Sequence, residues 1–457
     1  MLKEAAQKLE EVFSEKGFIR VITHIDADGI SSGAIIAQLL KEKNQTFWLS
    51  FVKQLDDSFI KSLFTDLKEC NCKAIIFLDL GSNKLNELES LKTKVFIVDH
   101  HQLENSEQDE TESALSNVVF VNPLLESEQE AEKLSASGLS YLVAKNLNLE
   151  KKFAQVSLLG MIGDLQDKNI SKDNKLILDD AKEAGMLLKR GLVVFSSLRP
   201  IHKSIEYSDL NVDSNLILRE TGINIKKEDG TYTTLLDLDE QQTSGLLTSI
   251  LLSRQNTSQD QDIIGNIYIV NIANQKWDAR ELATILNACG RLGYASVALS
   301  LLLDSRDSIK KIDEIYTRYK EQIVKGLNYA RGNKIERDGY VTINAKDNIK
   351  DTMIGTIVSI LASSLVYPDQ TVLVGLAYRE DKIKVSARVV RNNNNNNNHS
   401  NNKINLYLLL DSVIKKIGGE AGGHENAAGC LIDKEKEQDF LEALEEELKA
   451  IIPLPKR

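Results

Sequence analysis

Cysteine is scarce in this chain, and long apolar runs are missing from it. Four cysteines among 457 residues are too few for a disulfide scaffold and are typical of a protein from a reducing compartment. No run of about 18 apolar residues is present, which argues against a membrane-spanning helix. The first residues are charged and amphipathic, without the apolar stretch or cleavage site of a signal peptide. We therefore expect a cytoplasmic protein that has no membrane partner.

Positive charge is in the minority. The chain has 56 Lys and Arg residues against 67 Asp and Glu, a net charge of −11, which at first argues against a nucleic-acid partner. The excess is local, because residues 102–132 hold nine acidic residues and no lysine or arginine. We interpret this stretch as a solvated loop. The rest of the chain is nearly neutral, so its composition is compatible with a local basic groove.

Strand and helix patterns alternate in the first 198 residues. The stretches between the apolar segments mostly have helical spacing, and helices are expected to dominate from about residue 131 to 198. This alternation predicts βαβ units and an α/β fold built on a doubly wound parallel sheet. The segments that read as buried strands are residues 20–23, 47–52, 74–78, 95–98 and 118–121.

The remaining chain is interpreted as two further parts. Residues 199–338 combine helical stretches with a single apolar strand pattern, and we interpret them as a middle insertion. From residue 339 to 457, strand and helix patterns predict a smaller C-terminal α/β domain. Inside it, nine of the eleven residues from 392 to 402 are asparagine, which predicts a flexible loop.

Four short polar segments carry the residues that predict chemistry. Three of them follow directly on predicted strands, and the fourth follows an apolar, helix-like run at 156–162. Since the carboxyl ends of parallel strands meet at one edge of a sheet, we expect these segments to converge there. The side chains expected to form one cluster are His24, Asp26, Asp28, Asp79, His100, His101 and Asp164.

Such a cluster requires positive charge. Four carboxylates within a few ångströms repel one another and lose hydration, and the segments contain no lysine or arginine. Two divalent cations would balance them, and a His/Asp set without cysteine suits Mn²⁺, with Mg²⁺ and Co²⁺ as alternatives. Two ions about 3.5–4 Å apart stabilise the attacking and leaving oxygens of an in-line displacement at phosphorus. Asp79, which stands alone between two richer segments, is the best candidate for a bridging ligand.

The order of the segments HIDADG, DLG, DHH and GD resembles the DHH phosphoesterase superfamily. The glycine-rich residues 418–429 are similar to the GGHxxAAG signature of the DHH-associated domain, and residues 386–388 match the basic strand motif that accompanies it. Together these motifs resemble the RecJ-like single-strand exonucleases of the archaeal type, to which residues 281–291 are also similar. The resemblance implies a DHH catalytic domain over residues 1–198 and a substrate-binding domain over 339–457.

The resemblance also implies roles for the clustered residues. His101 would contact the scissile phosphate, and Asp99 would orient the two histidines. One metal ion would be held by His24, Asp26 and Asp79. The other would be held by Asp28, Asp79, His100 and Asp164.

In the C-terminal domain, the resemblance implies residues that bind substrate phosphates. Gly422, Gly423 and His424 would cradle a phosphate through backbone N–H groups and an imidazole, since glycines let an anion approach the backbone. The planar guanidinium of Arg388 would pair with a phosphate.

These implications predict a metal-dependent phosphodiesterase. We expect an exonuclease on single-stranded DNA or RNA that acts in replication or repair and uses two metal ions for in-line attack of water. A phosphodiesterase for short oligonucleotides or cyclic dinucleotides is the alternative with the same chemistry. An alternative of another class is a replisome scaffold with little catalysis, bound to the GINS complex and the replicative helicase. The motifs leave open the polarity of digestion and the choice between DNA and RNA.

Overall fold

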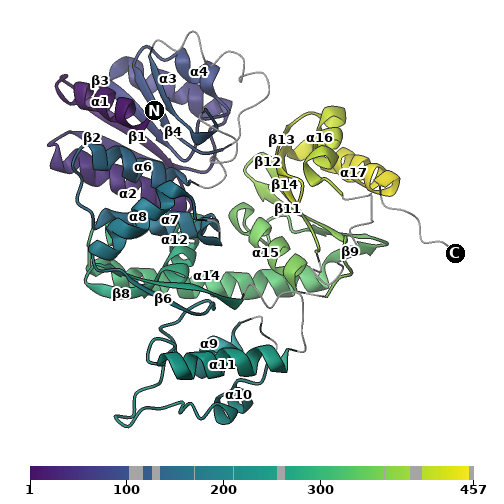
Figure 1. The fold of residues 1–457 in the computed structure, drawn as a ribbon. Helices are drawn as coiled ribbons and strands as arrows, with labels where there is room; N and C mark the ends of the chain where they lie inside the picture. The colour runs from purple at the N-terminus through teal and green to yellow at the C-terminus, as the bar shows by residue number, and fades with distance from the viewer. Residues whose placement is uncertain are drawn as a thin grey trace. The chain divides into compact units, whose positions relative to one another are not determined.

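The computed structural model describes residues 1–101, 117–125, 134–168, 170–208, 210, 212–254, 263–364, 366–391 and 404–451. Most of the acidic stretch at 102–132 and the whole Asn-rich stretch at 392–402 lie outside these residues. The chain forms two compact units (Figure 1). Unit 1 is Met1–Asn256 with Asp260–Tyr316, and unit 2 is Thr257–Gln259 with Thr317–Arg457. In the described parts of the chain, no helix has both the length and the apolar composition of a membrane span.

A five-stranded parallel sheet forms the first part of unit 1. Its strands are β1 (Phe18–His24), β2 (Phe47–Val52), β3 (Cys72–Leu78), β4 (Lys94–Val98) and β5 (Val118–Val121), in the spatial order β2-β1-β3-β4-β5. Strands β3 and β4 are buried from their second residue onward, which explains their continuous apolar sequences. The strands expected from the sequence are confirmed, and all of them end at the same edge.

Helices cover both faces of this sheet, as the doubly wound prediction requires. Alternate residues of β3 enter two separate cores: Ile76 and Leu78 join one, while Ile75 and Phe77 join the other. The first core includes α1 (Leu2–Phe13), α2 (Ala27–Glu42), α6 (Ala136–Asn146), α7 (Phe153–Gly163) and α8 (Lys172–Glu183). The second core includes α3 (Asp57–Glu69) and α4 (Leu85–Glu89).

A three-stranded antiparallel sheet continues unit 1, in the order β6-β7-β8. Its strands are β6 (Leu187–Leu192), β7 (Ile264–Ile272) and β8 (Gln275–Asp278). Helices α6, α7 and α8 dominate the described part of residues 131–198, as expected, but β6 was not predicted there, because the charged residues Lys189 and Arg190 interrupt its apolar pattern. Helices α9 (Ile201–Glu206), α10 (Ser214–Glu220) and α11 (Glu240–Ser253) share a small core of their own with β6.

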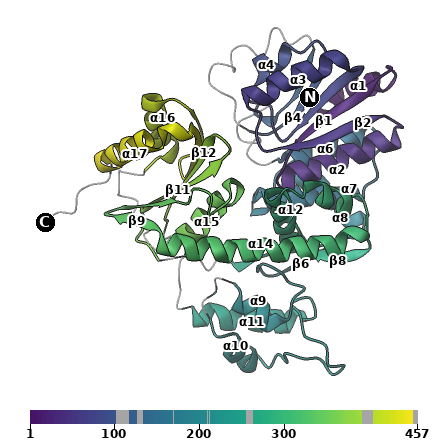
Figure 2. The ribbon, with the colours of Figure 1, turned by 180° about the vertical axis from the view of Figure 1, so that it is seen from behind.

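The later part of the middle region returns to the main core. Helices α12 (Ala279–Leu292) and α13 (Ala295–Leu302) both contact α2, and α12 also contacts α7. The long helix α14 (Asp307–Gly332) then leads from unit 1 into unit 2 and is visible in both ribbon views (Figures 1 and 2). Three short 3₁₀ turns complete the described elements: η1 (Pro123–Leu125), η2 (Gln166–Lys168) and η4 (Lys434–Lys436).

Unit 2 is the smaller α/β domain that the sequence predicted. Its six strands follow the order β13-β14-β12-β11-β10-β9, and only β10 and β11 pair in parallel. They are β9 (Lys334–Arg337), β10 (Tyr340–Asn344), β11 (Val372–Arg379), β12 (Lys382–Val389), β13 (Glu420–His424) and β14 (Ala427–Asp433). One face packs against α16 (Leu406–Ile417) and α17 (Glu437–Ile451), whereas α15 (Asp351–Ser363) packs on β11 and β12 from the other face.

Candidate metal centre and phosphate-binding face

The end of β1 and the start of α2 supply the first acidic residues of the cluster. Asp26 is the N-cap of α2, and its side chain accepts a hydrogen bond from the backbone N–H of Gly29 at 3.0 Å. A Cβ atom on Gly29 would lie 2.5 Å from the carbonyl oxygen of His24, so the tight turn requires glycine. This turn places His24 at the end of β1, Asp26 at the N-cap of α2 and Asp28 in the first turn of that helix.

Asp79 follows β3 and lies between two histidines from different strands. Its Oδ2 atom is 3.3 Å from His24 Nδ1, and its Oδ1 atom is 3.5 Å from His100 Nε2. Its backbone has a φ of 60°, a left-handed conformation that costs about 1–2 kcal/mol for most residues with a Cβ. The next residues, Leu80 and Gly81, complete this turn, and Gly81 also has a positive φ.

Asp99 holds the two histidines that follow β4. Its Oδ1 atom accepts from His101 Nδ1 at 2.7 Å and from the backbone N–H of His100 at 2.8 Å. Its Oδ2 atom accepts from the backbone N–H of Ser82 at 2.9 Å. Because the carboxylate is the acceptor, His101 carries its hydrogen on Nδ1 and leaves Nε2 for another partner. Asn122, which no sequence motif indicated, donates to the carbonyl of His101 at 3.0 Å.

Asp28 and Asp164 complete the cluster from helices. Asp164 is the C-cap of α7, and its Oδ2 atom is 3.2 Å from His100 Nε2. Asp28 accepts hydrogen bonds from the backbone N–H groups of Ala136 and Ser137, at 2.7 and 2.9 Å, in the first turn of α6. These amides were not predicted either, because a backbone donor has no signature in the sequence.

The structure brings together all seven side chains that were expected to converge. Three overlapping groups have ligand atoms that all lie within 4.8 Å of one another. These groups are His24 with Asp26 and Asp79, Asp28 with His100 and Asp164, and Asp79 with His100 and His101.

Burial and mutual repulsion raise the pKa of several of these carboxyl groups. Burial and then the charge of Asp79 raise the pKa of Asp28 to about 6, and burial and then the charge of Asp28 raise the pKa of Asp164 to about 7. Burial and then the charge of Asp26 also raise the pKa of Asp79. The pKa of Asp99, by contrast, is lowered, because its hydrogen bond with His101 and the charge of that imidazole outweigh the effect of burial.

The donor set fits a divalent cation. No ion pair between described residues joins Asp26, Asp28, Asp79 or Asp164 to a lysine or arginine. Three buried atoms of the cluster, His24 Nδ1, Asp79 Oδ2 and Asp164 Oδ2, lie close to other cluster atoms but make no hydrogen bond of good geometry with a described residue. Carboxylate and imidazole donors without thiolates suit Mn²⁺ and Mg²⁺. These acidic and histidine groups could therefore bind metal.

Helix α12 supports the turn between His24 and Asp28 from a distant part of the sequence. The Asn287 side chain accepts from the backbone N–H of Ala27 at 2.9 Å. One turn further along α12, a Cβ atom on Gly290 would lie only 1.6 Å from the carbonyl oxygen of Ile25. The segment at 281–291 thus contacts the acidic turn directly, a role that its sequence alone did not reveal.

The four expected phosphate-binding residues lie on neighbouring strands of unit 2. Arg388 on β12 pairs with Ala427 on β14, which pairs with His424 on β13, so Arg388 and His424 share one rung of the sheet. The Nε atom of Arg388 donates to Ser359 Oγ at 3.0 Å. The glycine-rich segment thus forms the hairpin of β13 and β14.

The glycines in this hairpin differ in what they require. Gly423 has a φ of 126°, and a Cβ atom there would lie 2.5 Å from the carbonyl oxygen of Ala427. A Cβ atom on Gly422, however, would meet nothing within 4 Å, so this residue faces open space. The backbone conformation therefore requires glycine at position 423, whereas the missing side chain of Gly422 leaves space on the surface of the strand.

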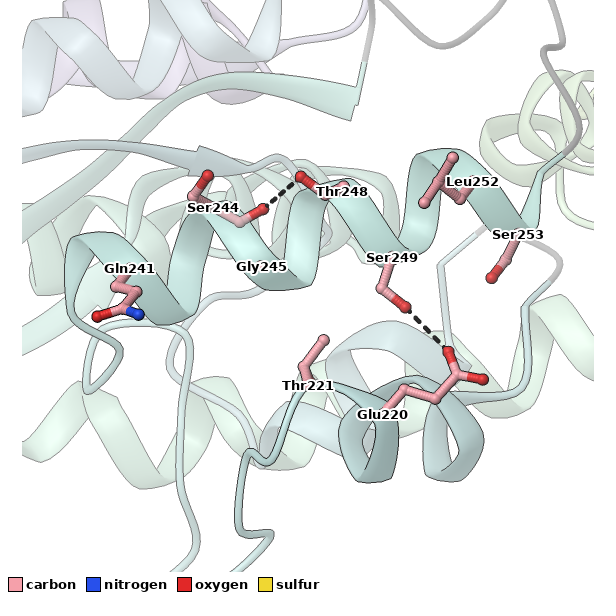
Figure 3. Close-up of a pocket in the computed structure, with 9 residues that line it drawn as sticks. All are labelled: Glu220, Thr221, Gln241, Ser244, Gly245, Thr248, Ser249, Leu252 and Ser253. Atoms are coloured by element: carbon pink, nitrogen blue, oxygen red, sulfur yellow. Dashed lines mark hydrogen bonds between the residues drawn. The ribbon is translucent and has the colours of Figure 1, made fainter.

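A separate hollow of about 720 Å³ lies between α10 and α11 in unit 1 (Figure 3). Hydroxyl groups and one carboxylate, Glu220, are its main polar features, and Ser249 donates to Glu220 at 3.2 Å. Its lining residues include no histidine, cysteine, lysine or arginine. This hollow therefore lacks the groups that make the acidic cluster chemically distinctive.

Comparison with known proteins gives matches in both units. Residues 18–161 match the DHH family, N-terminal domain, and residues 338–450 match the DHHA1 domain. An uncharacterized protein of Methanocaldococcus jannaschii is 28% identical over 440 residues, which cover 96% of this chain and 94% of that relative.

Solved structures share the fold at low sequence identity. RecJ from Thermus thermophilus in complex with Mn²⁺ has a TM-score of 0.60 and 18% identity; the match covers 100% of this chain but only 55% of that one. An exonuclease RecJ bound to manganese has a TM-score of 0.59 and 17% identity, with 99% and 95% coverage. CDC45 from Entamoeba histolytica has a TM-score of 0.62 and 12% identity, with 98% coverage of both chains.

Proposed function

Because this chain belongs to the DHH phosphoesterase superfamily and has a RecJ-like fold, we propose that it is an exonuclease on single-stranded nucleic acid. The DHH family match and the RecJ-like fold support a metal-dependent phosphoesterase. The observation that carries the narrower proposal is the convergence of four aspartates and three histidines at one sheet edge, in a chain that also has a DHHA1 domain with a basic strand. A role in replication or repair is part of the proposal.

The proposed metal ligands follow the grouping of the side chains. His24, Asp26 and Asp79 would hold one ion, and the second would be held by Asp28, Asp79, His100 and Asp164. Asp79 would bridge the two ions, since its two oxygens face different histidines. We propose Mn²⁺, with Mg²⁺ and Co²⁺ as alternatives, and the manganese-bound RecJ structures support this choice. When bound, the ions would activate water and stabilise negative charge at phosphorus.

The side chains themselves bind and orient the substrate in this proposal. Asp99 accepts from His101 Nδ1, and although burial lowers the pKa of this imidazole, the bond to Asp99 and its charge raise that pKa to about 9, so that Nε2 also carries a hydrogen and can donate to an oxygen of the scissile phosphate. In unit 2, the guanidinium of Arg388, together with Gly422, Gly423 and His424, would bind phosphates of the strand. Single-stranded DNA or RNA is thus the proposed substrate.

End-labelled single strands, digested in the presence of Mn²⁺, test the proposal. We expect stepwise shortening of strands of several tens of nucleotides, from one end, by the wild-type chain. The labelled end that is lost reports the polarity, and parallel DNA and RNA strands report the preference. Hydrolysis confined to strands of a few nucleotides or to cyclic dinucleotides would contradict the exonuclease proposal and favour a phosphodiesterase for short substrates.

The fold match to CDC45 supports a second candidate, a replisome scaffold that binds GINS and the replicative helicase. Every expected ligand position is occupied by a suitable residue here, which favours catalysis. Co-purification of GINS with the wild-type chain and with an inactive Asp79→Ala variant tests this role separately from hydrolysis. Equal capture by both chains would establish a binding role that is independent of activity.

A further inference from the structure

One face of β12 carries three polar side chains in register. The odd-numbered residues Ile383, Val385 and Ala387 are buried in the core with α16 and α17. Because side chains alternate along a strand, Lys384, Ser386 and Arg388 point to the other face. The sheet register places Leu431, Gly429 and Ala427 of β14 opposite these three residues.

Lys384 has no partner on this face. Its ammonium group forms no hydrogen bond or ion pair with any described residue, although the residue is only partly exposed. The charge of Asp351 acts on Lys384, but the Asp351 carboxylate itself lies 3.9 Å from Arg379. Burial lowers the pKa of Lys384, because the charged ammonium is less well solvated here than it would be in water. An ammonium in this position favours an anion from outside the chain.

Glycines lie beside these side chains, Gly429 on β14 and Gly355 on helix α15. A Cβ atom on Gly429 would lie 3.6 Å from Lys384 Nζ, and one on Gly355 would lie 3.3 Å from Ser386 Oγ and 3.9 Å from Arg388 Nη2. Gly422, on the same rung as Ser386 and Gly429, faces open space. Leu431 and helix α15 share this face and bury Ser386, whereas Gly429 adds no side chain beside Lys384 and Gly422 on the edge strand β13 faces open space, so a ligand can approach Lys384 from the side of β13.

We propose that Lys384 binds a backbone phosphate of the substrate strand that is different from the phosphate bound by Arg388. The two residues are four positions apart on an extended strand, which separates their Cα atoms by about 13 Å. The surface formed by Lys384 and Arg388 on either side of the buried Ser386, which we call the β12 strip, then follows a strand over more than one phosphate. This inference rests on the proposed function and deepens it, because a strip of this length suits a polymer better than a dinucleotide.

Binding of single strands at several salt concentrations tests the inference. The ligand is a fluorescent, phosphorothioate-linked oligothymidine, which keeps its charges and resists hydrolysis, and the full chain is used with Mn²⁺. Loss of one phosphate contact in Lys384→Met should weaken binding several-fold at low salt and reduce the slope of log K against log salt by about 0.7. Lys384→Arg should restore most of the slope, because it restores the charge.

A matched control separates the position from the charge. Lys415 lies on α16, against the opposite face of the sheet, and pairs with Asp411 at 2.7 Å. Lys415→Met removes the same charge and should leave both affinity and slope unchanged. If the wild-type chain binds the strand and Lys384→Met binds with the same affinity and slope, the inference is wrong while the proposed function stands. If the wild-type chain does not bind single strands, the proposed function is wrong as well.

Discussion

A single carboxylate, Asp79, makes the acidic cluster one site instead of two. Its two oxygens approach His24 and His100, which come from the ends of different strands. The residue is almost fully buried, and its left-handed backbone turns the side chain into the cluster. A carboxylate that is buried to this degree is expected to have a role that offsets the cost of its burial.

We predict that Asp79→Asn lowers Mn²⁺-dependent hydrolysis by at least about 100-fold, since it removes one oxygen ligand. In the metal-free protein the same change should raise the melting temperature, because one of several repelling carboxylates loses its charge. Activity assays and thermal unfolding check the two effects. Asp179→Asn, on the exposed face of α8, removes a charge elsewhere and should alter neither. Unchanged hydrolysis in Asp79→Asn would refute the bridging role.

Asp99 acts through His101 in this account, as a positioning residue. We predict that Asp99→Asn lowers the rate of hydrolysis by roughly 10–100-fold, because an amide no longer favours the Nδ1–H form of the imidazole. Substrate affinity should change little, so the loss should appear in kcat more than in KM. A fall confined to KM would contradict the positioning role and assign Asp99 to binding.

At the scale of elements, strand ends were predictable and distant helices were not. Strands β3 and β4 are buried on both faces, so their apolar runs were plain in the sequence and located the DLG and DHH segments at one edge. The contacts of Asn287 with Ala27 and of Ser137 with Asp28 join residues far apart in the chain. No local pattern encodes such contacts, because they depend on how α12 and α6 pack.

Helix α12 provides the test at this scale. We predict that Gly290→Ala destabilises the protein by roughly 1–3 kcal/mol and weakens Mn²⁺ binding, because the new methyl group would displace the turn at Ile25. Chemical denaturation and metal titration measure both effects. Gly245→Ala, at a helical glycine of α11 with open space around it, should be neutral or stabilise the protein by up to about 1 kcal/mol. Equal effects of the two substitutions would contradict the packing role of α12.

At the scale of the whole molecule, the two units have separate hydrophobic cores. The core of the parallel sheet and the core around β12, α16 and α17 share no residue. The acidic cluster belongs to unit 1, and the β12 strip belongs to unit 2. The net charge of −11 does not predict the local charge of the acidic cluster or of the β12 strip, because a sum over the whole chain does not reveal a local basic strand.

Separate cores predict separate responses to metal. In calorimetry we expect two unfolding transitions, of which Mn²⁺ raises only the one that belongs to unit 1, since a ligand stabilises the unit that binds it. Asp79→Asn should abolish that shift and leave the second transition in place. A uniform shift of both transitions would indicate that the units unfold together or that the metal binds in unit 2 as well.

The most direct test of the central claim is anomalous diffraction at the manganese absorption edge from crystals of the full chain grown with Mn²⁺. The account predicts two neighbouring anomalous peaks, one beside His24 and Asp26 and the other beside Asp28, His100 and Asp164, with Asp79 in contact with both. An acidic cluster without anomalous density under these conditions, or manganese bound only elsewhere on the protein, would contradict it.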